Sequence, residues 1–487
     1  MEEGAIVGIF TLCVFFGLLV ASDRKLIPQQ VLPLQSLMVL AALAFLALSL
    51  LAGKPLTRGT LFSVTTLHPI TATLTGFLLA GTVEAAGGFQ AAGRLLRMAG
   101  QSRWLGLPGA VFLLVNLPNL FAMPCGRVWA AALMPLVLML SKGVVQATGN
   151  ATLGPAIVVG FIINAAASCG PSPLGGIGMM GEGMAGYLPR SFSNHMQWSI
   201  MISTVLCMFF CAKMYKISAP IREELQPAET ALPPTAWFSC LCFFVGMSAI
   251  FLVEPPIPLQ ALLLMLTFVV MLVGKVSLQN MLAGISFHPL TAMIAGFMVA
   301  GALVVSGGFD AFNNILLFVA KNIPFGYALV GVVLVYVPLI FPMPCGRILS
   351  TSLLPGVLLF GQEVSRATGF ELAVPLLLVP FLLSCAASCG PSQLGGIGGI
   401  GEGNLRLKAG VFTMPQQLSL FIGVAISGLS VVVFGVSAAF PGVGQSILVI
   451  ISSIACAMAT NRLFEQPFWY PGGLLAGLLT GILMVVL

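Results

Sequence analysis

Two copies of the pentapeptide Met-Pro-Cys-Gly-Arg occur at residues 123–127 and 343–347, and each ends in an arginine between apolar segments. Arg127 and Arg347 stay charged in any protein environment, because a guanidinium does not lose its proton. Placing such a charge in the membrane interior costs at least about 2.5–3.5 kcal/mol on insertion scales. Each arginine also follows a proline at an expected helix start, where backbone N–H groups and the helix dipole favour anions. We therefore predict a site for an anionic substrate, formed by Pro124, Cys125, Gly126, Arg127, Pro344, Cys345, Gly346 and Arg347.

A second repeated motif, rich in glycine, proline and serine, occupies residues 168–178 and 388–398. An interrupted membrane helix presents backbone carbonyls, here next to serine hydroxyls. Such hard oxygen atoms suit sodium, which transporters hold at unwound helix segments. We predict cation-binding residues at Ser168, Gly170, Ser172, Ser388, Gly390 and Ser392. The alternative is that these glycines only allow close helix packing.

Three acidic residues in or beside apolar segments are candidates for a coupling or counter-ion role: Glu84, Glu182 and Glu402. Glu182 and Glu402 follow the two glycine-rich motifs at the same spacing, so each could neutralise an arginine, carry a proton or face an interface. An arginine held by such a glutamate, or by backbone carbonyls, would only brace the chain. Glu84 has Val304 at the matching position and could equally be solvated at the end of its helix.

The motif cysteines offer a competing chemistry, because thiolates prefer soft metals. If they met near the middle of the membrane, they could coordinate a metalloid or Cu(I); the four are Cys125, Cys169, Cys345 and Cys389. Their spacing is not that of a zinc site, and cysteine is also small enough for tight backbone contacts. We expect no enzyme, since a nucleophilic cysteine needs a base within hydrogen-bond reach and no histidine lies in or next to either motif.

Composition places these motifs in a membrane. Of the 487 residues, 58% are hydrophobic and 7% charged, and the mean hydropathy is +1.07. A soluble domain carries roughly a quarter charged residues, whereas many apolar runs here reach the about 20 residues that cross a bilayer as a helix. Their continuity excludes a β-barrel, whose strands alternate apolar and polar residues. No basic run indicates a nucleic-acid partner, and we attribute the +6 net charge to cytoplasmic loops.

The motifs belong to a duplicated unit, because the matched residues recur 220 positions later, as Arg127 does at Arg347. The same offset relates His68 to His288. We expect a first repeat (residues 1–212), a cytoplasmic connector (213–234), a second repeat (235–438) and two extra C-terminal helices (439–487).

Each repeat is expected to contain a re-entrant helical hairpin and a discontinuous helix. Residues 105–118 and 127–140 are apolar segments of about 14 residues, which as helices reach roughly 21 Å of the roughly 30 Å hydrocarbon core. Five crossings per repeat would bring the second repeat in from the opposite side, and the distribution of lysine and arginine agrees. The predicted fold class is an all-α polytopic membrane protein with two inverted repeats and about 12 spans.

This order of interfacial helix, re-entrant hairpin and broken helix, present twice and inverted, resembles the ion transporter superfamily of secondary carriers. The layout is nearest to the divalent anion/sodium symporters and the related citrate and arsenite permeases. The likeness covers most of the chain from about Val31 to Phe434. Residues 124–126 and 344–346 stand where those symporters carry Ser-Asn-Thr, and they depart from that signature. The resemblance implies a homodimer in which a transport domain moves against a scaffold as an elevator.

These features predict a secondary active transporter in the inner (cytoplasmic) membrane. It would be a symporter for a small, carboxylate-type organic anion, driven by Na+ or H+ and without a further cofactor. The competing hypothesis is an arsenite-type permease for soft metals or metalloids that uses the motif cysteines. A channel fits less well, because inverted repeats with broken helices favour alternating access. The expected partners are the anion, the lipid bilayer and a second copy of the chain.

Overall fold

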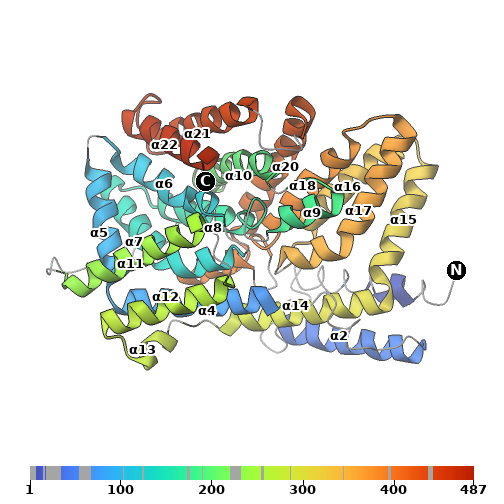
Figure 1. Ribbon diagram of the computed structural model, residues 1–487, viewed down its shortest axis with the longest axis horizontal. Coiled ribbons are helices and arrows are strands. Elements are labelled where there is room, and N and C mark those ends of the chain that lie inside the picture. The colour runs from blue at the N-terminus through green and yellow to red at the C-terminus, as the bar shows by residue number, and fades with distance from the viewer. Residues whose placement is uncertain are drawn as a thin grey trace.

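In a computed structural model of the chain, every regular element among the described residues is a helix (Figure 1). The prediction of an all-α chain is therefore confirmed. The structure describes residues 7–11, 13–14, 17, 34–53, 67–102, 104–122, 125–172, 176–188, 190–219, 232–253, 257–283, 285, 287–343, 345–392, 396–436 and 443–486.

The first half of the chain runs from α2 to a π-helical turn that extends α10. Its elements are α2 (Leu34–Leu51), α4 (Leu67–Ala85), α5 (Gly88–Gln101), α6 (Gly106–Leu120), α7 (Arg127–Thr148), α8 (Leu153–Ala167), α9 (Ile177–Ala185), α10 (Ser193–Phe209) and η1 (Phe210–Met214).

The second half repeats this order and then adds two helices. Its elements are α11 (Pro234–Val253), α12 (Leu259–Gly274), α13 (Leu278–Ala283), α14 (Phe287–Ser306), α15 (Gly308–Asn322), α16 (Gly326–Ile340), α17 (Gly346–Thr368), α18 (Ala373–Ala387), α19 (Ile397–Asn404), α20 (Thr413–Phe434), α21 (Val443–Leu463) and α22 (Pro471–Val486). Helices α4 to α10 thus recur in sequence as α14 to α20.

By length and composition, four described helical segments are able to cross a membrane: Arg127–Thr148, Ser193–Met214, Thr413–Phe434 and Val443–Leu463. Nine further apolar helices of 10–17 residues accompany them. Short apolar helices are typical of membrane proteins whose spans are interrupted or enter from one side. The pattern indicates a multi-pass membrane protein.

The two helices on either side of each Cys-Gly-Arg segment differ in length, contrary to the expectation of two equal segments of about 14 residues. Helix α6 has 15 residues, but α7 has 22; α16 has 15, but α17 has 23. The apolar run ends near Leu140, yet Ser141 and Lys142 do not stop a helix. The chain turns only at Gly149, where φ is 69°, a conformation that glycine adopts without strain.

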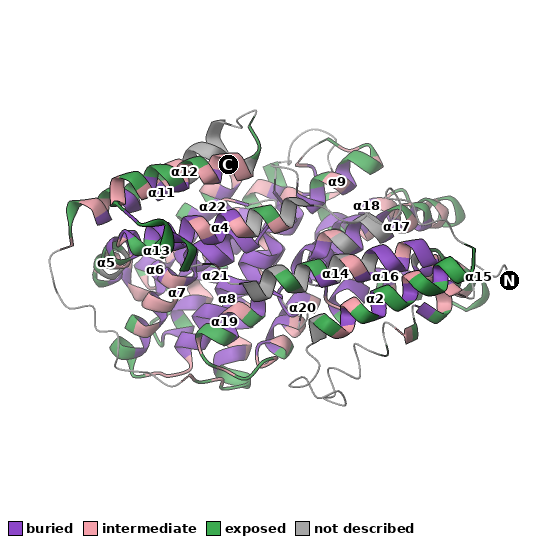
Figure 2. Cartoon of the chain, turned by 90° about the horizontal axis from the view of Figure 1, so that it is seen from below, coloured by how far each residue is buried: buried purple, intermediate pink, exposed green. Residues whose placement is uncertain are grey.

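The halves interlock instead of folding side by side. Helix α2 of the first half packs against α14 of the second, and α12 of the second packs against α4 of the first. Helices α8 and α18 touch each other in the centre, and α10 packs against α20 (Figure 1). Buried residues gather along this middle region around α8 (Figure 2). The glycine-rich segments therefore lie in the interior of the molecule.

The two C-terminal helices cover only one half. Helices α21 and α22 pack against each other, α22 packs on α6, and α21 packs on α10 (Figure 1). The matching helices of the second half, α16 and α20, have no such layer among the described elements. The C-terminal helices therefore cover α6 and α10 but not the matching α16 and α20.

Candidate functional site

Both glycine-rich segments interrupt a helix, and each folds back on itself. Helix α8 ends at Ala167 and α9 begins at Ile177, whose N–H donates to the carbonyl of Cys169 (2.8 Å). In the second half the N–H of Ile397 donates to the carbonyl of Cys389 (2.7 Å). In the same way, the N–H groups of Gly178 and Gly398 donate to the carbonyls of Gly170 and Gly390, both at 3.0 Å. We call the described residues of these two segments, 168–172 with 176 and 388–392 with 396, the first and second break.

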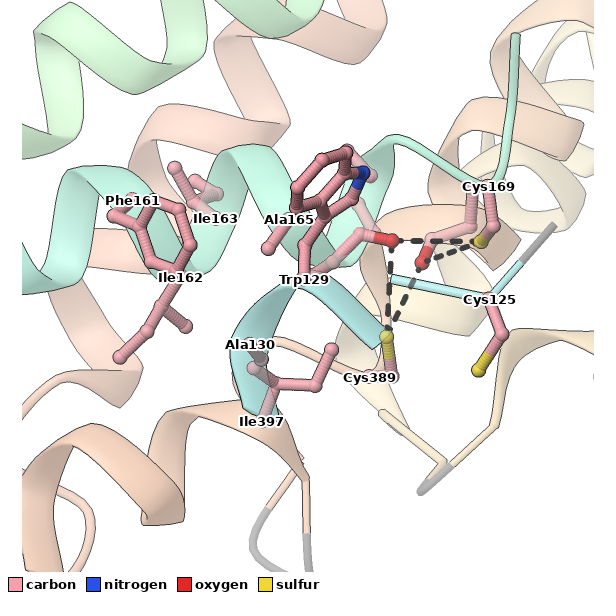
Figure 3. Packing of buried hydrophobic residues seen from close by; sticks show 14 of the residues in the cluster. Cys125, Trp129, Ala130, Phe161, Ile162, Ile163, Ala165, Cys169, Cys389 and Ile397 are labelled. Carbon is pink, nitrogen blue, oxygen red and sulfur yellow. Dashed lines mark hydrogen bonds between the residues drawn. The ribbon is translucent and has the colours of Figure 1, made fainter. Parts of the chain in front are cut away.

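The two breaks meet. The Cys169 thiol lies within hydrogen-bond distance of the carbonyl of Ala166 in its own half (3.4 Å) and of Ala386 in the other (3.7 Å). The Cys389 thiol has the reciprocal partners, Ala386 at 3.5 Å and Ala166 at 3.8 Å (Figure 3). The two halves thus make matching contacts with each other. The ends of α8 and α18 therefore cross at the centre of the molecule.

The Cys-Gly-Arg segments join the breaks through glycine. A Cβ atom on Gly126 would lie 1.7 Å from the carbonyl oxygen of Ala165, and one on Gly346 would lie 1.8 Å from that of Cys385. No side chain fits at such a distance from backbone, so only glycine is possible at both positions. The starts of α7 and α17 are thereby seated on the last turns of α8 and α18.

Each motif arginine extends toward the opposite half. Arg127 is 2% exposed, and it lies near Cys345 and Cys389 of the other half. Arg347 approaches the Met180 sulfur on α9, with Nη1 and Sδ 3.8 Å apart. Of the other predicted anion-site residues, Cys125 and Gly126 lie next to Arg127, and Cys345 and Gly346 lie next to Arg347. Pro124 and Pro344 are outside the described residues. Two buried or half-buried cations thus flank the crossing of the breaks.

The serines predicted to bind a cation are all buried. The hydroxyl of Ser168 donates to the carbonyl of Ala165, and that of Ser388 donates to the carbonyl of Cys385, both at 2.8 Å. Their oxygen lone pairs remain able to accept, as for any hydroxyl. Ser172 and Ser392 lie further along the breaks, with 1% and 3% of their surface exposed. The breaks therefore offer neutral oxygen atoms away from bulk water.

Glu182 and Glu402 bind backbone groups. The carboxylate of Glu182 accepts hydrogen bonds from the N–H groups of Arg190 (3.0 Å) and Phe192 (2.7 Å). Glu402 accepts from the residues 220 positions on, at 2.9 and 2.7 Å. Each glutamate therefore fixes the turn that leads into α10 or α20, which favours a structural role over that of an arginine counter-ion. Glu84, in the last turn of α4, has an exposed side chain.

The motif cysteines do not form a ligand set. Within the described residues, no three cysteine, histidine, aspartate or glutamate side chains lie close enough together to hold a metal ion. The thiols of Cys169 and Cys389 are directed at backbone carbonyls. The use of these cysteines for a metalloid stays a prediction, as does the alternative that they are present for their small size.

Two residues at the breaks belong to none of the predicted sites. Met196 and Gln416 occupy matching positions in the first turns of α10 and α20, and both are 0% exposed. A Cβ atom on Gly178 would lie 3.4 Å from the Met196 sulfur, and one on Gly398 would lie 3.4 Å from the Gln416 oxygen. The 220-residue offset could have identified this position in the sequence, because it pairs the thioether of Met196 with the amide of Gln416.

A buried polar group in the first half is also absent from the predictions. The side-chain amide of Asn164 donates to Asn116 and to Thr204, both at 3.1 Å, and thus links α8 to α6 and α10. The matching residues of the second half are Ser384, Tyr336 and Val424. These side chains cannot build the same network; in the second half the hydroxyl of Tyr336 instead donates to the carbonyl of Phe421 (3.0 Å) and links α16 to α20.

The central region thus combines two crossing helix breaks, two helix starts seated on them through glycine, and two arginines that lie beside the opposite half. Its serine hydroxyls and backbone carbonyls are neutral, and Arg127 and Arg347 carry positive charge. A scan against protein-family models and a search of curated proteins find no match to this chain. Its function is therefore inferred from the chemistry of this region.

Proposed function

We propose that the chain is a secondary active transporter that moves a small anion, of the organic carboxylate class, across the cytoplasmic membrane together with Na+ or H+. The proposal includes inverted repeats and the homodimeric, elevator-type mechanism implied by the resemblance to the ion transporter superfamily. It accounts for features that a structural membrane protein would not need.

The observation that carries the proposal is the meeting of the two breaks through Cys169 and Cys389. Non-helical backbone at membrane depth is tolerated only where protein buries it or where it lines a polar cavity. Secondary transporters place their substrate and ion sites where discontinuous helices of two repeats meet. Two breaks at one crossing, each seated on a glycine tip, match that arrangement.

The charge of the region supports an anion as substrate. Arg127 is almost fully buried, and Arg347 lies at the matching tip of the other half. Glu182 and Glu402 are engaged with backbone N–H groups, and an entering carboxylate would add negative charge beside the two guanidinium groups. Guanidinium groups bind carboxylates through two parallel hydrogen bonds.

The same geometry supports the proposal of coupling to a cation. The breaks carry hydroxyl and carbonyl oxygens and lie beside the arginine tips. A cation bound at a break would offset the charge of the anion, so the two would bind more favourably together than apart. In an elevator, this mutual dependence permits movement only of the empty or the fully loaded transport domain.

An uptake experiment tests the proposal. Purified protein in proteoliposomes is screened with labelled di- and tricarboxylates, sulfonates and arsenite, with and without a Na+ or pH gradient. We expect carboxylate uptake that Arg127→Gln and Arg347→Gln each reduce about 30-fold or more, since each removes a buried charge contact. Arg366→Gln, on the exposed end of α17, is the matched control and should transport normally. Carboxylate uptake that persists unchanged in both tip variants would refute the anion site.

A further inference from the structure

The two breaks are equivalent in backbone but differ in the side chain that faces them. At the first break, the Met196 sulfur would contact a Cβ atom on Gly170 at 3.2 Å and on Gly178 at 3.4 Å. At the second, the Gln416 oxygen takes the same place, at 3.6 Å from a Cβ on Gly390 and 3.4 Å from one on Gly398. One break therefore faces a thioether, and the other faces an amide.

The amide of Gln416 is buried without a protein partner. Its side chain is 0% exposed, and neither Oε1 nor Nε2 has a hydrogen bond to any described residue. Ser392, in the second break itself, is 3% exposed, and its Oγ atom also has no partner among the described residues. Burying polar atoms without partners costs free energy. Such atoms beside interrupted backbone indicate a ligand.

The chemistry of these atoms selects the ligand. Amide, hydroxyl and backbone carbonyl oxygens are hard and neutral, which suits a hard monovalent cation. A divalent ion ordinarily recruits carboxylates, but the carboxylate of Glu402 is held by the N–H groups of Gly410 and Phe412. The thioether of Met196 is a soft donor and a poor ligand for sodium.

We propose that the second break is the single coupling-cation site of the chain, with Oε1 of Gln416 and Oγ of Ser392 as ligands for Na+, and that Met196 closes the first break to cations. This inference rests on the proposed transport function and makes it more specific, because it sets one sodium ion per chain.

Thermal unfolding of the purified full-length protein in detergent tests the site without transport. NaCl is titrated against choline chloride at constant ionic strength. We expect Na+ to raise the Tm of the wild type with single-site dependence, because a ligand that binds only the folded state stabilises it. Gln416→Met should weaken the apparent Na+ affinity about tenfold or more, since it removes a direct ligand.

Two matched variants separate this role from folding. Gln417→Met makes the same change one residue further on, where the amide donates to the carbonyl of Leu339 (3.0 Å); it should keep the Na+-dependent rise in Tm. Met196→Gln should keep that rise and add a second binding event, seen as a steeper limiting slope of Tm against the logarithm of the Na+ concentration. Gln416→Met that retains the wild-type Na+ response overturns the inference, as does a wild type with two sites or none.

The outcomes also separate this inference from the proposed function. Carboxylate uptake that ignores Na+, together with a Tm that ignores Na+, overturns the sodium site and leaves the transporter. Stabilisation by Na+ that depends on Gln416, without uptake of any anion tested, supports the sodium site and contradicts the proposed function.

Discussion

The two halves share the same order of helices, but the first is covered by the C-terminal helices and the second is more exposed. On α6 every described side chain is buried or half-buried, because α22 covers the helix. On α16, the matching helix, Leu329, Val332 and Ile340 are 50%, 56% and 48% exposed. The same contrast recurs at the breaks, where Met196 faces one and the unpartnered amide of Gln416 faces the other.

The difference teaches that duplication preserved the backbone crossing while the side chains specialised. Features that maintain the crossing are present twice, such as Gly126 with Gly346 and Glu182 with Glu402. Features that brace or fill are present once, such as the Asn164 network of the first half. Substitutions at matched positions should therefore have equal effects in the first class and unequal effects in the second.

The largest effect is expected at the glycine tips. Gly126→Ala and Gly346→Ala each place a Cβ within 1.8 Å of a backbone oxygen. Neither substitution can be accommodated unless one of the two helices in contact is displaced. We expect each to destabilise the protein by about 3 kcal/mol or more, at or above the usual cost of overpacking. Gly143→Ala, on α7 with nothing within 4 Å of its Cβ position, is the control. Thermal unfolding measures all three, and tolerance of one tip variant alone would contradict the shared backbone plan.

The glutamates should also behave as a pair. Glu182→Ala and Glu402→Ala each leave two backbone N–H groups without their charged acceptor. The expected loss is about 2–3 kcal/mol of unfolding free energy in both variants. Denaturant titration checks this equality. A glutamate whose replacement leaves stability intact but changes the anion affinity would instead be a counter-ion.

Replacing Asn164 in the first half should cost more stability than replacing the matching Ser384 in the second half. Asn164→Ala removes two buried hydrogen bonds and should cost about 1–3 kcal/mol. Ser384→Ala, at the matching position, removes a buried hydroxyl that has no partner among the described residues, so the change should stay within about 0.5 kcal/mol. Equal losses in a chemical unfolding experiment would show that the second half is braced in the same way.

Replacing the motif cysteines should have the smallest effect. Serine at the four positions keeps their size, so carboxylate uptake should persist at a somewhat reduced rate. The thiols that contact backbone carbonyls are weak donors, and their loss should cost about 1 kcal/mol or less. Uptake assays with a carboxylate and with arsenite measure the outcome. Selective loss of arsenite uptake would instead support a metalloid permease.

Much of the fold could be predicted from the sequence because duplication doubles each signal. The helical class follows from long apolar runs, and the two helix interruptions follow from proline and glycine at residues 168–178 and their copy. The length of α7 could not be read from hydropathy, because Ser141 and Lys142 continue the helix beyond the apolar run. A change in polarity does not end a helix, whereas Gly149 does.

The site was predictable in its positions and less so in its roles. The sequence places Arg127 and Ser168 in the repeated motifs, but it does not show which groups those side chains contact. The carboxylate of Glu182 binds backbone N–H groups ten residues on, a contact that depends on how the following turn folds. Gln416 lies outside both motifs and reaches the second break only through the packing of α20.

Cross-linking of Cys169 to Cys389 tests most directly whether the two halves meet at their breaks. The measurement uses a variant that retains only these two of the eleven cysteines, with a protease site introduced within residues 220–231 and a short membrane-permeant reagent for thiols. After cleavage, the two halves should migrate together on a non-reducing gel, because both thiols contact the carbonyls of Ala166 and Ala386. Halves that separate, as they must in single-cysteine controls, would contradict a shared central site.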